Sequence, residues 1–291
     1  ESYKNIKLIR STMNRSTRNS QSAISTIANK TYIQYIIDTS ASMTYLSSAV
    51  KDGLKRFVED QVKIAKDENR LDTTYFKLVE FNTRKKIRFN GLIGEFKIED
   101  IRILFDGLTR LFDSVSEEVE TILKKIKPKK ELQSLGVPSS KAVLIVMTDG
   151  ENNLGSPYPT QMRGLIEKAR GQGVICTFMG ANQNACETGV EYGFAQDASL
   201  TFTPQPFQTV AAMRAVSSGT QRALSKPGQC DIVYSQMERQ QSQGTGYIDT
   251  IYPLRRANAC DSQFVFNDDY DDDYDDDHGE DYHQSKKRRK S

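Results

Sequence analysis

The sequence predicts a doubly wound α/β fold, with a mostly parallel six-stranded sheet, helices on both faces and one antiparallel edge strand. Three observations predict it. Short apolar runs rich in β-branched residues alternate with amphipathic helical patterns, which is the order of strand–helix–strand units. The central run is apolar throughout, as in a strand that is buried on both faces. One pair of strand patterns is joined only by a short turn, which indicates an antiparallel hairpin.

Each element in the first half of the pattern has its own signal. Residues 33–37 form a short β-branched run that predicts a buried strand. Apolar residues spaced by three and four positions over 50–65 predict an amphipathic helix. The stretches 75–81 and 86–89 predict two strands joined by the turn sequence NTRK. A second helical stripe, over 115–126, ends shortly before a proline.

The second half continues the alternation around the most apolar strand of the chain. Residues 142–147 (AVLIVM) carry no polar side chain, so we expect them at the centre of the sheet. Right-handed crossovers between parallel strands then place helices on both faces. The remaining expected elements are a helix over 161–171, a strand over 174–179, a short helix over 185–193, a strand over 198–203 and a helix over 207–225.

Composition changes sharply at both ends of this pattern. The net charge of +2 combines a basic start, an almost neutral middle and an acidic end. A short lead-in helix around Ile24 and Ile27 is an alternative for the start. We expect a mobile basic arm at 1–30, one Rossmann-like α/β domain at 31–225, an extended polar segment that docks through its apolar stretches at 226–266, and a disordered acidic tail at 267–291 ending in the basic cluster Lys286–Lys290.

Residue types exclude several classes of function. The histidines, His278 and His283, lie in the acidic tail, so the expected domain has no imidazole to act as a base or a ligand. The sequence motifs of P-loop, zinc-peptidase, dinucleotide-binding and nucleophile-elbow enzymes are absent, and we expect no enzyme. The four cysteines lack metal-site spacing and fit a reducing compartment. No apolar run suits a membrane span, and the first residues give no support for secretion.

Polar residues follow the buried strands at one edge of the predicted sheet. Asp38, Ser40 and Ser42 follow the first strand, Thr109 precedes the second helical stripe, and Asp149 follows the central strand. Because ligands of doubly wound sheets bind at the carboxyl ends of the strands, we expect these side chains to lie close together. Carboxylate and hydroxyl oxygens are hard donors that suit Mg²⁺, with Mn²⁺ as an alternative. An ion held with few charged ligands can still accept a carboxylate from another molecule.

The same residues resemble a known family. The sequence DTSAS at 38–42, then Thr109, then TDG at 148–150, on this alternation of strands and helices, is similar to a von Willebrand factor A domain with a complete metal-ion-dependent adhesion site. The resemblance covers about residues 31–225. It implies that Ser40, Ser42 and Thr109 are direct metal ligands and that Asp38 and Asp149 bind the ion directly or through water.

Two further features refine this resemblance. Asp113 resembles the aspartate of a TxLxD motif in intracellular members, which implies a supporting or structural role. The sequence GANQ at 180–183 is more similar to bacterial and intracellular members than to integrins. Intracellular members include scaffolds of ubiquitin, repair, transcription and RNA-quality-control complexes, so the resemblance implies assembly rather than catalysis.

Simpler interpretations exist for each site residue taken alone. Asp38 and Asp149 are in sequences that also suit ordinary turns, and Ser42 also suits a helix cap. Glu151 is either a further ligand or a solvated side chain. The occurrence of all five oxygen-bearing residues in this order favours the metal site.

We therefore expect a non-enzymatic interaction module that binds an Asp or Glu side chain of a protein partner through Mg²⁺. The acidic tail is a candidate intramolecular competitor for the ion, and a solvating spacer is the simpler alternative. A second hypothesis is a nucleic-acid-associated protein that uses the basic arm and Lys286–Lys290 on phosphates. A third is a regulatory subunit that presents the domain to an ATPase or a ubiquitin ligase. We expect an intracellular location, cytoplasmic or nuclear, with Lys286–Lys290 as a nuclear localisation signal, and no membrane partner.

Overall fold

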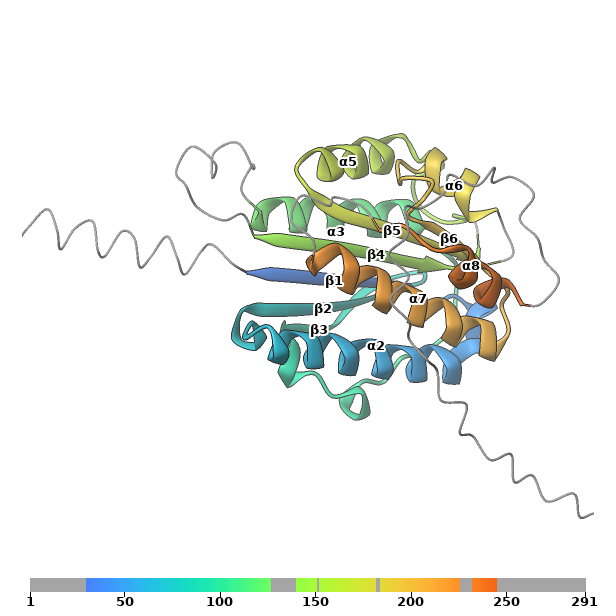
Figure 1. Ribbon diagram of the computed structural model, residues 1–291. Coiled ribbons are helices and arrows are strands. Elements are labelled where there is room, and N and C mark those ends of the chain that lie inside the picture. The colour runs from blue at the N-terminus through green and yellow to red at the C-terminus, as the bar shows by residue number, and fades with distance from the viewer. Residues whose placement is uncertain (1–29, 127–139, 151, 182–183, 226–231, 245–291) are drawn as a thin grey trace, which may run out of the picture. The chain divides into compact units, whose positions relative to one another are not determined.

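The computed structural model describes residues 30–126, 140–150, 152–181, 184–225 and 232–244. Six strands form one sheet in the order β3-β2-β1-β4-β5-β6, and every neighbouring pair is parallel except β2 and β3 (Figure 1). This confirms the predicted doubly wound sheet with its antiparallel edge strand. The strands are β1 Thr31–Asp38, β2 Thr74–Phe81, β3 Lys85–Leu92, β4 Lys141–Thr148, β5 Val174–Ala181 and β6 Ser199–Phe202.

Helices cover both faces of the sheet, as the alternating pattern predicts (Figure 1). One face carries α2 Ser47–Asp67 and α7 Pro206–Ser225. The other carries α3 Leu111–Lys125, α5 Thr160–Gly171 and the short α6 Ala185–Glu191. Four 3-10 turns complete this part of the chain: η1 Ala41–Leu46, η2 Leu71–Thr73, η3 Ile93–Glu95 and η4 Ile98–Asp100.

The two cores follow from the two-residue period of the strands. On β1, Ile33, Tyr35 and Ile37 pack toward α2 and α7, whereas Ile36 packs toward α3 and α5. Nearly every residue of β1 is buried because helices cover both sides of the sheet. The strand therefore has apolar residues on both of its faces, because each face packs against its own core.

Close contact between α2 and α7 depends on a glycine. Gly53 lies in the middle of α2, and a Cβ atom there would fall 2.2 Å from Sδ and 3.1 Å from Cβ of Met213 on α7. Met213 is itself buried in the core. The missing side chain thus allows the two helices to approach each other, and this sets the position of α7 against the sheet.

The segment 226–266, for which the sequence suggests extended structure, contains a further helix, α8 Gln236–Gln243. Its start is a capping box, in which the Ser235 hydroxyl accepts from the Glu238 backbone N–H and the Glu238 carboxylate accepts from the Ser235 N–H. Arg239 on α8 donates to the carbonyl oxygens of Ser199 at 2.8 Å and Asp197 at 3.0 Å. These charge-assisted bonds fasten α8 to the start of β6.

Several predictions fall outside the described residues. These are the basic arm up to residue 29, the rest of segment 226–266 and the acidic tail with Lys286–Lys290. Among the helices that the structure does describe, none is long and apolar enough to cross a membrane.

The α2–α7 contact generates a prediction for a pair of glycines. Replacing Gly53 with Ala forces Met213 and its surroundings to move, and we expect a loss of about 1–3 kcal/mol in the free energy of unfolding. Gly164 in α5 is exposed with no atom within 4 Å of an added Cβ. Gly164→Ala should therefore stabilise the chain by up to about 1 kcal/mol. Urea unfolding of both variants measures this, and equal effects would contradict the packing argument.

Candidate metal centre

The candidate site lies where the sheet reverses its strand order. β1 and β4 are parallel neighbours, and their helical connections lead to opposite sides of the sheet. Asp38 is the last residue of β1, and Thr148 is the last residue of β4. Their side chains meet, because Thr148 Oγ1 donates a hydrogen bond of 2.6 Å to Asp38 Oδ2. This is the switch point at which doubly wound folds bind their ligands.

Asp38 supplies a fully buried carboxylate to this position, with an exposed fraction of 0%. Besides the bond from Thr148, its Oδ1 accepts from the backbone N–H of Ser40 at 2.8 Å. Burial raises the pKa of Asp38 to about 6, although hydrogen bonds from Thr148 and Ser40 oppose the shift; the nearby charge of Asp149 raises it further. The ionised form is thus costly here unless a positive charge lies beside it.

Three more predicted residues join Asp38 in one hydrogen-bonded cluster. The Ser42 hydroxyl donates to Asp149 Oδ1 at 2.9 Å, and the Ser40 and Ser42 hydroxyl oxygens lie 3.0 Å apart. A hydroxyl has one proton to donate, so Ser40 is the donor to Ser42. Burial raises the pKa of Asp149, and the bond from Ser42 partly offsets this. Ser40 and Asp149 are buried while Ser42 is exposed, so the cluster opens to solvent at Ser42.

Thr109, the fifth predicted residue, is buried beside the Asp149 loop. Its N–H donates to Asn153 Oδ1 at 2.7 Å, and its carbonyl accepts from the N–H groups of Asn153 and Leu154. A Cβ placed on Gly150 would lie 4.0 Å from Thr109 Oγ1, so the hydroxyl is next to the TDG turn. The structure therefore brings the five residues to one edge of the sheet. It adds Asn153, which the sequence analysis missed.

Backbone hydrogen bonds also join the Thr109 loop to the loop after β1. The N–H of Asp106 donates to the Thr39 carbonyl at 2.9 Å, and the N–H of Ala41 donates to the Gly107 carbonyl at 3.2 Å. Since the Asp149 loop is bonded to Thr109, the three loops hold one another in place. The position of each oxygen therefore depends on all three.

Asp113 has the supporting position that the resemblance implies. Its Oδ2 accepts from Arg110 Nε at 3.0 Å and from the Ser156 N–H at 3.3 Å, so it connects α3 to the loop after β4. Gly155 lies over it with a φ of +86°, and a Cβ there would fall 2.2 Å from Asp113 Oδ2. Only glycine suits that conformation and that contact. Asn152 adds a further tie, because its side-chain oxygen accepts from the Phe112 N–H at 3.2 Å.

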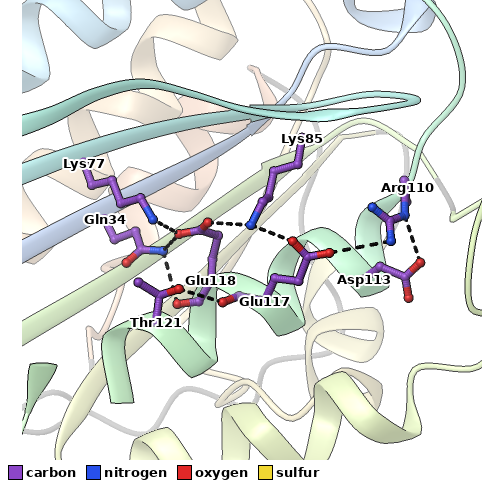
Figure 2. Close-up of polar contacts among 8 residues, drawn as sticks. All are labelled: Gln34, Lys77, Lys85, Arg110, Asp113, Glu117, Glu118 and Thr121. Carbon is purple, nitrogen blue, oxygen red and sulfur yellow. Dashed lines mark hydrogen bonds and ion pairs between the residues drawn. The ribbon is translucent and has the colours of Figure 1, made fainter. Parts of the chain in front are cut away.

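A buried ion-pair network fastens α3, and with it the Thr109 loop, to the sheet (Figure 2). At its centre is Glu118, whose side chain is 1% exposed. Its carboxylate contacts Lys77 Nζ on β2, Lys85 Nζ at 2.8 Å and Gln34 Nε2 on β1 at 2.5 Å. Glu117 pairs with Lys85 at 2.7 Å and with Arg110 at 3.6 Å, so the network reaches the residue after Thr109.

The charges of this network balance locally. Burial alone would lower the pKa of Lys85, but hydrogen bonds and charges from Glu117 and Glu118 outweigh it and raise the pKa. A buried carboxylate is tolerated when partners satisfy its oxygens, as Lys77, Lys85 and Gln34 do for Glu118. The network therefore positions α3 and takes no part in the oxygen cluster at Asp38.

The donor set fits a divalent ion that prefers oxygen. Within the described ranges, no three His, Cys, Asp or Glu side chains group into a metal site, so an ion here would depend on hydroxyls beside two carboxylates. Such hard oxygen donors match Mg²⁺ and Mn²⁺. The raised pKa of Asp38 also indicates a site that a cation would stabilise. Glu151, the sixth candidate ligand, and residues 182–183 of GANQ lie outside the described residues.

Comparisons with known proteins bear on the fold. No protein-family model and no curated protein matches the sequence. The pilus adhesin SpaC from Lactobacillus rhamnosus GG, in its open conformation, matches with a TM-score of 0.51 and 13% identity, over 67% of this chain and 30% of the adhesin. At this identity the match shows the fold alone, and it agrees with the sheet described above.

Two other matches have lower TM-scores. Proximal thread matrix protein 1 from the mussel byssus, in a structure with a zinc-occupied MIDAS motif, gives 0.47 and 19% identity over 67% of this chain and 46% of that one. A von Willebrand factor type A protein from Catenulispora acidiphila gives 0.44 and 15% over 66% and 43%. This chain spans less than half of these solved chains. Its own strand order and helix placement are those of a doubly wound α/β fold.

The buried charge of Asp38 predicts a gain in stability when it is removed. A folded-state pKa of about 6, against an ordinary value of 3.8, means that ionised Asp38 opposes folding by about 3 kcal/mol near neutral pH. The cost is present above pH 6 and disappears as the pH falls toward 4. In EDTA at about pH 7, we expect Asp38→Asn to raise the free energy of unfolding by about 1–3 kcal/mol.

Urea unfolding across this pH range measures the effect, with Asp72→Asn as the control because Asp72 is exposed. The wild type should gain stability from this group on acidification, and the Asp38 variant should lose that dependence. A variant that is less stable than the wild type at pH 7 would contradict the assigned cost of the charge.

The network at Glu118 predicts the opposite result for a different carboxylate. Glu118→Gln leaves Lys77 buried without its counter-charge, and we expect a loss of about 3–5 kcal/mol in stability. Glu120 is exposed on the same helix, so Glu120→Gln should change stability by about 0.5 kcal/mol or less. Thermal and urea unfolding distinguish the two. Similar losses in both variants would show that the network does not hold α3.

Proposed function

We propose that this chain is a non-enzymatic interaction module that binds an acidic side chain of a protein partner through Mg²⁺, with Mn²⁺ as a substitute. The single observation that carries the proposal is the oxygen cluster at the switch point, open to solvent at Ser42. The proposed ligands are Asp38, Ser40, Ser42, Thr109 and Asp149.

The chemistry of these ligands favours capture of an anion. When bound, the ion supplies a positive charge with a coordination position open to an outside oxygen. The two carboxylates of Asp38 and Asp149 balance its charge, and the hydroxyls add oxygens without adding charge. Exposure of Ser42 leaves the ligand position accessible to a partner. A carboxylate on the partner is the matching group because it is hard, anionic and common on protein surfaces.

The same residues favour binding over catalysis. The Ser40 hydroxyl is bonded to another hydroxyl, and the chain's only histidines lie at 278 and 283, beyond the described domain. A serine nucleophile needs a base that can take its proton. The alternative roles in nucleic-acid binding, and in nuclear import, rest on the arm and on Lys286–Lys290, which lie outside the described residues. They remain predictions. So do the role as a regulatory subunit of an ATPase or a ubiquitin ligase, and the intracellular location.

Metal titration tests the proposal directly. Calorimetric titration of Mg²⁺ and Mn²⁺ into the full chain should show one site, and saturating metal should raise the free energy of unfolding by about 2.7 kcal/mol at a hundredfold excess over Kd. Ser42→Ala removes one ligand and should weaken binding about tenfold or more. Ser48→Ala is the matched control, because Ser48 is also exposed but lies on α2 outside the cluster.

The outcomes separate cleanly. Metal binding that is lost on Ser42→Ala and kept on Ser48→Ala supports the assigned ligands. Equal binding by both variants contradicts the ligand set. A folded wild type that takes up neither ion contradicts the proposed function.

A further inference from the structure

A pocket opens between α2 and α7 on the side of the candidate metal site. Its volume is about 340 Å³, which suits one large side chain with some of its backbone. The floor includes Ala49 and Val210. The lining also includes Tyr45, Asp52, Arg56, Phe207 and Arg214.

The pocket and the oxygen cluster share one continuous helical face. Ser42 and Tyr45 are three residues apart in η1, so their side chains project from the same side, and both are exposed. Ala49 lies seven residues after Ser42, across the junction with α2. At a rise of about 2.0 Å per residue in η1 and about 1.5 Å in α2, the near part of the pocket lies between Tyr45, about 6 Å from Ser42 along the helix, and Ala49, about 12 Å from it, and the lining continues beyond them to Arg56.

Two exposed aromatic residues flank the pocket. Tyr45 on η1 is 56% exposed, and Phe207 in the first turn of α7 is 72% exposed. Exposed apolar residues also stand on the other two site loops, with Leu108 beside Thr109 at 50% and Tyr158 after the Asp149 loop at 71%. Apolar groups gathered around a polar centre are typical of a surface that binds another protein.

The charges that line the pocket indicate the sign of the charge on the partner. Arg56 and Arg214 line it together with Asp52, which leaves an excess of positive charge. Within the part of the chain that the structure describes, neither guanidinium takes part in an ion pair. Guanidinium groups bind carboxylates with two parallel hydrogen bonds, so this charge complements an acidic segment.

We propose that this pocket receives an aromatic side chain of the same acidic peptide segment whose carboxylate binds at the metal site. This deepens the proposed function, on which it rests, by adding a second point of recognition. An extended peptide advances about 3.3 Å per residue, so a separation of about 6–12 Å places the aromatic residue two to four positions from the metal-binding acid. Further acidic residues beside the aromatic one face Arg56 and Arg214.

The test uses fluorescein-labelled peptides and fluorescence polarisation with the full chain. The probe is Gly-Asp-Gly-Gly-Phe-Glu-Gly, in which Asp and Phe are three positions apart. One matched peptide replaces Phe with Ala, and another replaces Asp with Asn. Each is titrated in Mg²⁺ and in EDTA. We expect the Phe peptide to bind about tenfold more tightly than the Ala peptide, because the pocket covers its ring.

Protein variants assign this preference to the pocket. Phe207→Ser should remove the preference for Phe while leaving the Mg²⁺ dependence unchanged. Met237→Ser is the matched control, because Met237 is also an exposed apolar residue (62%) but lies on α8, away from the residues that line the pocket. Arg214→Glu should weaken binding of the Phe peptide, because it places a negative charge where the Glu of the peptide would meet a positive one.

The four outcomes distinguish the pocket from the metal site. Mg²⁺-dependent binding with the preference for Phe supports both proposals. Mg²⁺-dependent binding with equal affinity for Phe and Ala peptides overturns the pocket and leaves the proposed function standing. A preference for Phe with equal affinity in Mg²⁺ and in EDTA supports a pocket for the ring but contradicts the proposed function and the binding of one segment at both points. Absence of binding by all three peptides contradicts both.

Discussion

Burial of the Asp38 carboxylate at the end of β1 is the constraint on which the site depends. An ionised group with no exposed surface is costly, and here its pKa rises to about 6 even with hydrogen bonds from Thr148 and Ser40. The fold tolerates the charge because two apolar cores on either side of the sheet supply stability independent of the site. A folded protein that keeps such a group at a topological switch point has an arrangement suited to a cation.

The loops around Asp38 are held by groups that do not themselves approach the cluster. Asn153 forms hydrogen bonds with both the N–H and the carbonyl group of Thr109, and Asp113 accepts one from the loop after β4. Glu118 fixes α3 against the sheet (Figure 2). Metal ligands need positions accurate to a fraction of an ångström, and such supporting contacts provide them. The hydroxyl oxygens thus belong to a rigid frame, whereas Ser42 alone among the cluster reaches solvent.

Sequence was sufficient for the sheet and for the placement of five oxygen-bearing residues, because parallel strands bring their carboxyl ends to one edge whatever lies between them. It was insufficient for Asn153, Gly155 and Glu118. Their roles depend on partners 40 or more residues away in the sequence, namely Thr109, Asp113 and Lys77. A local sequence pattern does not indicate such distant contacts. α8 is different, since Ser235 and Glu238 are a local capping signal. Its polar composition concealed it, because the helix docks through Arg239 on backbone carbonyls rather than through an apolar stripe.

Selectivity cannot come from the oxygen cluster alone. Any surface carboxylate can meet a metal ion, so an ion-centred site distinguishes partners only through the surface around it. Here that surface comprises two exposed aromatic residues, two guanidinium groups and a pocket between α2 and α7 that begins at η1, which carries Ser42. In the proposed function the cluster provides the affinity for an acid, and in the further proposal the pocket between α2 and α7 distinguishes one acidic segment from another. Because α7 forms one wall of the pocket and contributes no residue to the oxygen cluster, a change that moves α7 against α2 should alter the proposed pocket contact and leave the proposed metal contact in place.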